Sequence, residues 1–244
     1  MSNPTPDSPA HSVSSGRPAT VAGRTLAVGD IHGCRAALET LLAIIQPSAA
    51  DTVVTLGDYV DRGPDARGVV EMLLRLERAC QLIPLLGNHE QMLLEAADDE
   101  DTLTTWLMYG GLETLTSYGL ARNAYTREMI PAAHRDFFAR CRTWYETETH
   151  LFVHAGVEAH LPLEEQKLDV LRWDRLRDYG PHASGKTVIC GHTRQINGLP
   201  LNLGHTICID TWVYGEGWLT CLDVATRRYW QANQRGESRE GQVD

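Results

Sequence analysis

Three short apolar runs mark the first part of the chain, at residues 26–28, 53–56 and 83–86. Each run is bounded by polar residues and glycine and is too short for a helix, a pattern that is typical of buried strands. After each run, apolar residues recur at helical intervals of three or four positions. Strand and helix therefore alternate, and this order predicts an α/β fold with a core of parallel strands.

We expect the helices over residues 34–45, 65–79 and 90–97. Pro47 follows the first helix and Pro64 stands before the second, as proline does where a helix ends or begins. Residues 98–140 change character and predict several short helices without a chemical motif. We interpret them as a helical insertion that caps one side of the sheet and in which substrate selectivity resides.

The chain then returns to strands. Residues 149–153 and 187–190 predict two of them, and the later segments 206–210, 218–222 and 228–231 have the pattern of short antiparallel strands that close a second sheet.

The two ends of the chain differ from its middle. Residues 1–22 are rich in Ser, Pro, Thr and Ala and predict a disordered tail. Residues 233–244 are polar and predict a C-terminal tail that frays. One domain is expected between them, over residues 23–232.

Polar groups stand directly after five of the predicted strands. The first three are Gly-Asp-Ile-His-Gly at 29–33, Gly-Asp-Tyr-Val-Asp-Arg-Gly at 57–63 and Gly-Asn-His-Glu at 87–90. His-Ala-Gly at 154–156 and Gly-His-Thr at 191–193 follow later strands. Open α/β folds bind ligands at the edge where the carboxyl ends of the strands meet, so these side chains are candidates for one site.

The five motifs, in this order, resemble those of the calcineurin-like metallophosphoesterases. More narrowly, they resemble the bacterial members of the phosphoprotein phosphatase family of serine/threonine phosphatases. The resemblance extends over residues 24–230. It implies an αββα sandwich of two mixed sheets flanked by helices, whereas the residues alone indicate only an α/β fold with a parallel core.

The resemblance also implies a centre of two divalent metal ions. Asp30 and His32 would hold the first ion, Asp58 would bridge, and the second ion would be completed by Asn88, His154 and His192. Aspartate and histidine together suit ions such as Mn²⁺, Fe or Zn²⁺, and we expect Mn²⁺. The positive charge of such a centre matches a phosphomonoester dianion.

Four further residues match positions with roles in the reaction. Arg62 and Arg175 would grip the phosphate oxygens, although Arg172 or Arg177 could take the place of Arg175. By the same resemblance a hydroxide that bridges the two metals attacks phosphorus in line.

The leaving group needs a proton, and His89 is the candidate general acid because it follows Asn88 directly. Asp61 would orient His89 and raise its pKa. One departure stands near the site. Relatives usually carry a glycine after the pair that matches Asp210-Thr211, and Trp212 occupies that place here, where we expect it to narrow the pocket or to change which substrates enter.

Composition restricts the partners. A formal net charge of -10 without clustered Lys or Arg argues against a nucleic-acid partner. No apolar run is long enough to span a bilayer, so no membrane partner is expected. The six cysteines stand singly, which favours reduced thiols in a cytoplasmic protein. The sequence sets no oligomeric state.

Three functions are compatible with these observations. The first is a metal-dependent phosphatase for phosphoserine and phosphothreonine in proteins or for small phosphomonoesters. The second keeps the chemistry but acts on dinucleoside polyphosphates, as a symmetrical diadenosine tetraphosphate hydrolase does. The third is a catalytically dead fold used as a binding scaffold, which predicts missing ligands, and no ligand is missing. The Gly-His-Thr motif around His192 favours the first function.

Overall fold

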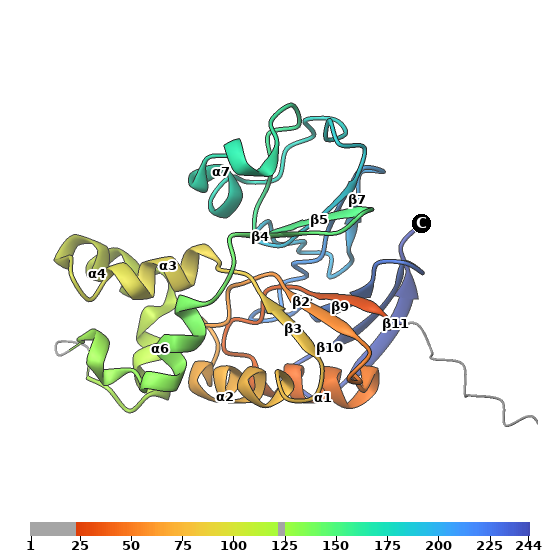
Figure 1. Ribbon diagram of the computed structural model, residues 1–244. Helices are drawn as coiled ribbons and strands as arrows, with labels where there is room; N and C mark the ends of the chain where they lie inside the picture. The colour runs from red at the N-terminus through yellow and green to blue at the C-terminus, as the bar shows by residue number, and fades with distance from the viewer. Residues whose placement is uncertain (1–22, 122–124) are drawn as a thin grey trace, which may run out of the picture.

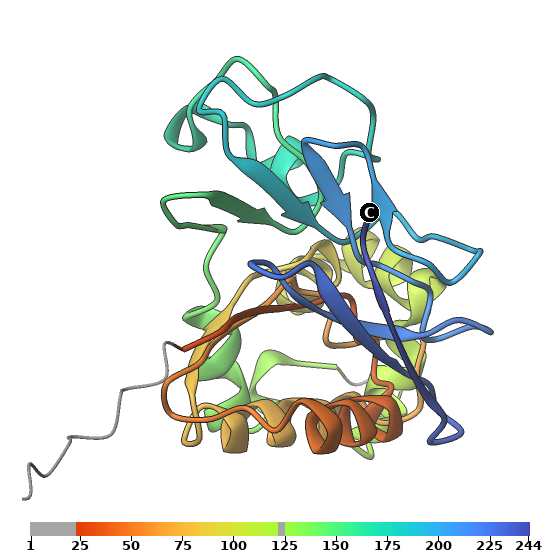
Figure 2. The ribbon, with the colours of Figure 1, turned by 90° about the vertical axis from the view of Figure 1, so that its right-hand side faces the viewer.

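Two mixed sheets face each other in the computed structural model, which describes residues 23–121 and 125–244 (Figure 1). Helices cover the outer side of the first sheet, and a shorter helical segment lies outside the second (Figure 2). This arrangement confirms the predicted αββα sandwich. The predicted N-terminal tail, residues 1–22, lies outside the described residues.

The first sheet has six strands in the order β11-β10-β9-β1-β2-β3. Strands β1, β2 and β3 are parallel, as the alternating pattern predicted. The strand bounds are β1 (Thr25–Val28), β2 (Thr52–Thr55), β3 (Gln81–Pro84), β9 (Leu219–Asp223), β10 (Arg228–Ala232) and β11 (Ser238–Gln242).

The second sheet has five strands in the order β4-β5-β6-β8-β7. Its centre is parallel, with β5, β6 and β8 running in one direction. The bounds are β4 (Trp144–Glu146), β5 (His150–Val153), β6 (Thr187–Cys190), β7 (Leu201–Asn202) and β8 (Thr206–Cys208).

Strand β1 explains why two layers form. Successive side chains of a strand point to opposite faces. Leu26 and Val28 therefore join the apolar cluster between the first sheet and its helices, whereas Ala27 joins the cluster that lies between the two sheets. Phe152 and Ile189 enter that same cluster from the second sheet. Both faces of β1 are thus buried, and its residues 26–28 are all apolar.

The assignment of the late strands to a second sheet was wrong in part. Strand β8 does lie in that sheet, but it is parallel to β6. Strands β9 and β10 instead extend the first sheet, where β9 is antiparallel to β1. Every residue of β9 is buried, and a strand that is covered on both faces carries no alternation to show which sheet it joins.

The C-terminal segment does not fray over its whole length. Residues 238–242 form β11, which pairs with β10 along five residues. Most of its side chains are exposed, so backbone hydrogen bonds rather than apolar burial hold it. A polar sequence at a sheet edge therefore has no apolar pattern by which it could be recognised as a strand.

Helices α1 (Arg35–Ile45) and α2 (Ala66–Leu76) lie under the first sheet (Figure 2). The side chain of Asp65 caps α2 by accepting a hydrogen bond from the Gly68 N–H at 2.8 Å. Helix α3 (Asn88–Glu95) begins directly in the third motif. Outside the second sheet lie the short helices η3 (Leu163–Glu165) and α7 (Leu168–Arg172).

Residues 98–140 contain a series of short helices at one end of the first sheet (Figure 1). The bounds are α4 (Glu100–Trp106), the π-helical turn η1 (Leu107–Gly111), α5 (Leu112–Ser117), η2 (Arg127–Met129) and α6 (Ala132–Ala139). Trp106, Leu115 and Phe137 are fully buried and belong to the same apolar cluster as α1 and α2. The segment therefore shares one core with the first sheet.

Two observations concern the expectations of reduced thiols and of no membrane partner. All six cysteines are free, and five of them are buried. Among the described residues, no helix has both the length and the apolar character that a bilayer crossing requires.

Candidate metal centre

The six predicted metal ligands gather where the carboxyl ends of β1, β2, β3, β5 and β6 meet between the two sheets. Each follows the end of its strand by four residues or fewer. Five of them are buried and the sixth is half-buried: Asp30, His32, Asp58, Asn88, His154 and, half-buried, His192. The structure thus brings together all six side chains, from positions that are far apart in the sequence.

Asp58 lies at the centre of the group. Its Oδ2 is 3.4 Å from Nε2 of His32, and its Oδ1 is 3.4 Å from Nε2 of His154. The site contains two sets of candidate ligands, and within each set the ligand atoms all lie within 4.8 Å of one another. Asp58 belongs to both sets. Burial by itself would raise the pKa of Asp58, but the positive charges that the surrounding histidines carry when protonated outweigh burial and lower it well below its ordinary value. One carboxylate is therefore shared by two sets.

The three predicted histidine ligands are each fixed by a backbone carbonyl. A carbonyl only accepts, so the ring nitrogen that faces it carries the proton. The pairs are His32 Nδ1 with Val60 O at 2.9 Å, His154 Nδ1 with Leu56 O at 2.8 Å, and His192 Nε2 with Trp173 O at 3.0 Å. The second ring nitrogen of each neutral imidazole then carries a lone pair on the side of the site, which is the form that binds metals. At His32 this nitrogen, Nε2, accepts a hydrogen bond from Arg62 Nη1 at 2.8 Å.

Burial keeps these rings neutral. It lowers the pKa of His32 and of His154, and it lowers that of His192 to about 4. Asn88 Oδ1 lies 3.0 Å both from Nε2 of His154 and from Nδ1 of His192. In these tautomers three acceptor atoms face one another without a proton to share. Such a set repels itself unless a cation lies among its members, so the donor set fits a divalent metal ion.

Asp30 is buried beside this group, but it belongs to neither of the two sets. Its carboxylate accepts hydrogen bonds from the backbone N–H of His192 at 2.9 and 3.2 Å. Burial, followed by the charges of Asp210 and Asp58, raises the pKa of Asp30 well above its ordinary value. Positive charge at this place would relieve the repulsion among the three carboxylates.

At two motif positions only glycine fits, because the backbone there lies against one of these carboxylates. A Cβ atom on Gly191 would lie 2.0 Å from Oδ1 of Asp30, and a Cβ atom on Gly87 would lie 2.1 Å from Oδ1 of Asp58. Neither distance is possible for real atoms. Glycine therefore lets the backbone of one motif touch the acidic side chain of another.

Backbone strain is concentrated at the site. Eight non-glycine residues in the described part of the chain have a positive φ, and five of them are predicted site residues: His32, Asp58, Asp61, Arg62 and His192. Side chains at positive φ are disfavoured, so surrounding contacts must hold them there.

Glu90 supplies such contacts for the second motif. Its buried carboxylate accepts hydrogen bonds from the backbone N–H groups of Asp58, Tyr59 and Val60 at 2.7–3.2 Å, and from Gly87 at 3.1 Å. Burial, followed by the nearby Asp58 charge, raises the pKa of Glu90 to about 8. From the sequence we expect Glu90 at a helix start with a hydrogen bond near the site, but not its contacts with four backbone N–H groups. Its place three positions after Gly87, as in a capping box, was the available signal.

His89 differs from the three ligand candidates because its protonated ring nitrogen is held by a carboxylate, whereas theirs are held by backbone carbonyls. Its Nδ1–H donates to Oδ2 of Asp61 at 2.6 Å, as the resemblance implied. Burial by itself lowers the pKa of His89, but the charges of Asp58 and Asp61 outweigh burial and raise it. His89 therefore holds its proton to higher pH than an ordinary histidine.

Two residues that hold Asp61 were missed in the sequence. The indole N–H of Trp106 donates to the Asp61 carboxylate at 2.9 and 3.0 Å, and the Thr114 hydroxyl donates to it at 2.7 Å. Thr114 Oγ1 also accepts the Asp61 backbone N–H at 2.8 Å. Both come from the helical segment and both are buried. No local motif marks them, because only the fold brings them to Asp61.

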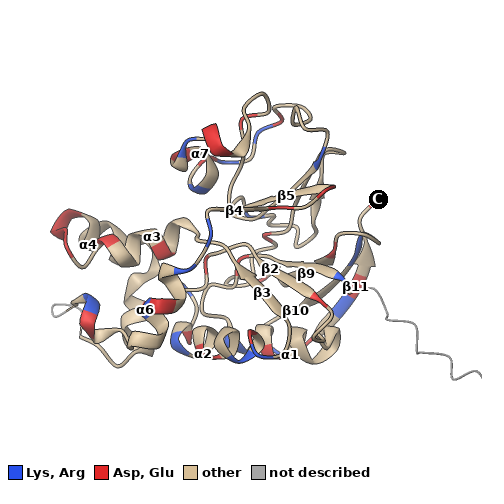
Figure 3. Ribbon diagram, in the orientation of Figure 1, with Lys and Arg blue, Asp and Glu red and all other residues tan. Residues whose placement is uncertain are grey.

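A cleft of about 340 Å³ opens beside the metal ligands. Its lining contains three arginines, three aromatic residues and no carboxylate: Arg62, Asn88, Tyr109, Trp173, Arg175, His192, Thr193, Arg194 and Tyr214. The chain as a whole carries a net charge of -10, with acidic residues spread over several elements such as α4 (Figure 3). The cleft is therefore locally positive on an acidic protein.

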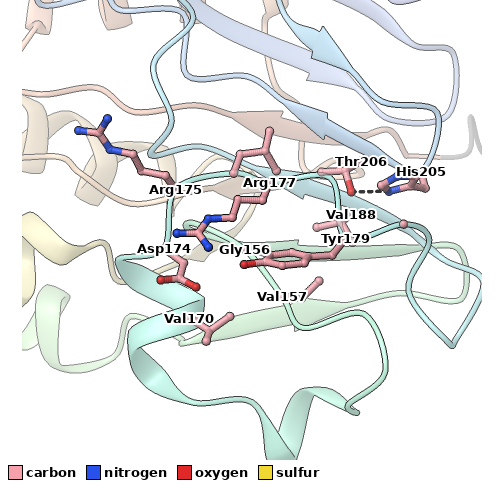
Figure 4. Close-up of a pocket in the computed structure, with 12 residues that line it drawn as sticks. Gly156, Val157, Val170, Asp174, Arg175, Arg177, Tyr179, Val188, His205 and Thr206 are labelled. Atoms are coloured by element: carbon pink, nitrogen blue, oxygen red, sulfur yellow. Dashed lines mark hydrogen bonds between the residues drawn. The ribbon is translucent and has the colours of Figure 1, made fainter.

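The structure separates the three arginines that were considered for the second phosphate contact. Arg175 lines both the cleft and a second pocket beside it, whereas Arg177 lines only the second pocket and leaves the same loop in a different direction (Figure 4). Arg172 is half-buried, and its Nη2 donates to Thr143 Oγ1 at 3.1 Å. Of the three, only Arg175 reaches the cleft.

Trp212 does not line the cleft, so it does not narrow it, whereas an effect on which substrates enter stays a prediction. Tyr214 lines the cleft in its place. The Trp212 indole packs against Gly215, where a Cβ atom would meet it at 2.3 Å. The φ of Trp212 is 65°, in the left-handed region where glycine is favoured, which is the physical reason why glycine suits this position.

Comparisons with known proteins agree with this geometry. The sequence profile of the calcineurin-like phosphoesterases matches residues 23–195. Serine/threonine-protein phosphatase 1 of Salmonella typhimurium is 34% identical over 157 residues, which cover 62% of this chain and 68% of that protein. A symmetrical bis(5'-nucleosyl)-tetraphosphatase of an Acidovorax species is 48% identical over only 71 residues, which cover 29% of this chain and 25% of that protein.

A solved structure matches most of the fold. A cold-active protein tyrosine phosphatase superposes with a TM-score of 0.63 at 20% identity, over 89% of this chain and 78% of that one. At this identity the likeness shows the fold alone.

Proposed function

This chain belongs to the calcineurin-like phosphoesterases, and we propose that it hydrolyses phosphomonoesters, with phosphoserine and phosphothreonine in proteins as its substrates. The observation that carries the proposal is the convergence of three inward histidine lone pairs on Asp58 and Asn88. Every predicted ligand is present, which argues against a catalytically dead scaffold.

We propose the ligand sets that the resemblance implied. Asp30, His32 and Asp58 would hold one ion, and Asp58 would share the second ion with the amide and histidine donors Asn88, His154 and His192. Mixed oxygen and nitrogen donors suit Mn²⁺, with Fe or Zn²⁺ as alternatives. When bound, two such ions supply an acidified water and positive charge for the phosphoryl group.

His89 is the proposed general acid. The Asp61 carboxylate fixes its Nδ1–H at 2.6 Å, so the remaining ring nitrogen is the one that can deliver a proton. The raised pKa of His89 keeps the ring protonated to higher pH than in an ordinary histidine. Protonation of the departing serine or threonine oxygen is its proposed role. Asp61 acts through His89, and Trp106 and Thr114 hold Asp61.

Arg62 and Arg175 would bind the phosphate oxygens. Their planar guanidinium groups match a phosphoryl group with two parallel hydrogen bonds. The absence of Asp and Glu from the cleft lining leaves this positive charge for the substrate.

A protein substrate is supported by the form of the cleft. It is open, and Tyr109 and Trp173 at its rim are 54% and 37% exposed, so they offer contact area to residues beside a phosphorylated side chain. The relative named as a serine/threonine phosphatase also matches over most of both chains. We further propose the cytoplasm as the compartment, which the free thiols fit.

Dinucleoside polyphosphates are the alternative substrates. The same exposed aromatic side chains could stack on nucleobases. Relatives named as tetraphosphatases also match most of this chain: the asymmetrical enzyme of Oceanobacillus iheyensis is 26% identical over 212 residues, which cover 75% of this chain and 82% of that protein. Our preference for a protein substrate therefore rests on the higher identity of the phosphatase match, 34% over 157 residues, and on the Gly-His-Thr motif around His192.

A substrate comparison on protein reconstituted with Mn²⁺ tests the proposal. The kcat/KM for a phosphoserine peptide is expected to exceed that for diadenosine tetraphosphate at equal metal concentration, and a chelator should abolish both reactions. Faster cleavage of the dinucleotide would favour the alternative. Turnover of p-nitrophenyl phosphate that is insensitive to the chelator would contradict the metal-dependent reaction itself.

A further inference from the structure

The cleft holds a third arginine that the reaction described above does not use. Arg194 directly follows Thr193, which with Gly191 and His192 forms the last motif, and it lines the same cleft as Arg62 and Arg175. Its side chain is exposed. Neither the motifs nor the proposed chemistry gives it a role.

Tyr214 links Arg194 to the proposed phosphate site. Arg194 Nη1 donates to the Tyr214 hydroxyl at 3.2 Å. The Arg62 guanidinium lies over the ring of the same tyrosine, 4.6 Å from its centroid. The ring also meets the His32 imidazole edge-on at 4.8 Å. One aromatic side chain thus holds two guanidinium groups at neighbouring places next to a predicted metal ligand.

Arg194 has no carboxylate partner among the described residues, since it forms no salt bridge there. Other exposed arginines do pair: Arg67 with Glu71 at 3.0 Å and Arg228 with Glu240 at 2.6 Å. The contact with Tyr214 and, to a lesser extent, the charge of the buried Asp210 raise the pKa of Arg194. The Asp210 carboxylate itself accepts the Trp212 N–H at 3.1 Å. The charge of Arg194 therefore faces the cleft without a protein counterion.

Trp212 supports this placement. Its indole ring lies 5.9 Å from the Arg194 guanidinium, so the arginine is flanked by one aromatic ring and bonded to the hydroxyl of another. Both contacts favour a fixed position for the guanidinium while leaving donor groups for a ligand.

We propose that Arg194 and Tyr214 form a second anion subsite that selects substrates with a further anionic group beside the transferred phosphoryl group. The same chemistry describes the next phosphoryl group of a polyphosphate chain and an acidic side chain near a phosphorylated residue. The inference rests on the proposed function, because the neighbouring centre must carry out the hydrolysis. Arg194 is then a specificity-determining residue.

The test compares substrates with one and with two anionic groups. p-Nitrophenyl phosphate carries one. A phosphoserine peptide with aspartate beside the phosphoserine is matched by the same peptide with asparagine there, and diadenosine tetraphosphate is the polyphosphate probe. Arg194→Ala should lower the ratio of kcat/KM for aspartate over asparagine peptide, or for dinucleotide over p-nitrophenyl phosphate, by roughly 10- to 100-fold, as expected for charge-assisted hydrogen bonds. A change in the peptide ratio would identify the anion as an acidic side chain, and a change in the dinucleotide ratio would identify it as a further phosphoryl group.

Two further variants sharpen the test. Tyr214→Phe removes only the hydroxyl that accepts from Arg194 and should lower the same ratio by roughly 2- to 10-fold. Arg177→Ala removes an exposed arginine that lies outside the cleft and should leave both ratios as in the wild type. A ratio that is unchanged in Arg194→Ala on both arms would overturn the subsite, as would an equal change in Arg177→Ala.

Binding provides a readout that does not depend on turnover. The aspartate and asparagine peptides are titrated into the full-length protein by calorimetry. The wild type should prefer the aspartate peptide, and Arg194→Ala should lose that preference. If p-nitrophenyl phosphate is not hydrolysed but the preference is seen, the proposed function fails while the subsite stands. Absence of the preference in the wild type, together with no response to the dinucleotide, overturns the subsite.

Discussion

The floor of the site and the rim of its cleft are built in different ways. The floor consists of buried side chains from five motifs, several of them at positive φ. The rim consists of more exposed side chains such as Tyr109, Trp173 and Arg194, which lie on loops and on the helical segment. Close contacts between the motifs hold the floor residues in place. The rim depends instead on which loops and helices the fold brings to the cleft.

This difference predicts how the two regions tolerate change. A substitution in the floor should alter metal binding or the chemical step for every substrate. A substitution at the rim should alter the choice among substrates.

The largest effect at constant metal content is expected from His89→Asn. Loss of the general acid should lower kcat by roughly 10²–10⁴-fold while the metal content stays as in the wild type. The metal content of the purified variant, measured by mass spectrometry beside its kcat, checks both parts. Loss of metal in parallel with activity would make His89 a ligand instead, and its place in one candidate ligand set gives that outcome a structural basis.

The dependence of kcat on pH also tests whether His89 is the general acid. The raised pKa of His89 means that its acid form is present below that pKa and is lost as pH rises through it. The wild-type kcat should therefore fall on the alkaline side. In His89→Asn this alkaline decrease should disappear, whereas its persistence would assign the decrease to another group.

Two motif glycines form a matched pair. In Gly191→Ala the new methyl group would collide with the Asp30 carboxylate, at 2.0 Å, whereas in Gly156→Ala its closest neighbour would be the Val170 carbonyl oxygen at 3.9 Å. Displacement of a site residue by about an ångström costs up to roughly 10²-fold in rate. We expect a loss of that order in Gly191→Ala and near-normal kcat in Gly156→Ala. Equal behaviour of the two variants would refute the steric account of the floor.

A smaller effect is expected where the helical segment holds the general acid. Thr114→Val keeps the shape of the side chain but removes the hydroxyl that bonds the carboxylate and backbone N–H of Asp61. Because Trp106 still holds the carboxylate, we expect kcat to fall by roughly 10-fold, as for other groups that orient a functional residue. Unchanged kcat at full metal content would show that Asp61 needs no support from this segment.

The smallest effect is expected at the rim. Tyr109→Ala removes an exposed aromatic side chain of the cleft lining. We expect KM for a phosphoserine peptide to rise by roughly 2- to 10-fold, as for the loss of one aromatic contact, with kcat retained. A fall in kcat without a change in KM would place Tyr109 in the floor and break the division.

The same division explains what could be predicted from the sequence. The strand-motif-helix order determined the parallel sheet β1-β2-β3, and the six candidate ligands follow strand ends that must meet at one edge. Trp106 and Thr114 were missed because they reach Asp61 only through the packing of the helical segment. Arg194 and Tyr214 were missed as a site because their contact joins residues from two loops.

The errors in the fold have related causes. Strand β9 was assigned to the wrong sheet because its residues are all buried and show no alternation that indicates a side, and β10 lies in the same sheet because it pairs with β9. Strand β11 was interpreted as a tail because ladder hydrogen bonds, rather than apolar side chains, hold an exposed edge. In both cases the deciding contacts are made by the backbone, which leaves little trace in the sequence.

Metal stoichiometry tests the central claim most directly, since the account places Asp58 between two ions. After loading with Mn²⁺ and removal of the excess, the wild type should retain two ions per chain by mass spectrometry. Asp58→Asn should retain fewer than one and lose activity to background, because the shared ligand serves both. Asp178→Asn, which removes an exposed carboxylate away from the site, should retain two. Two ions retained by Asp58→Asn would contradict the account.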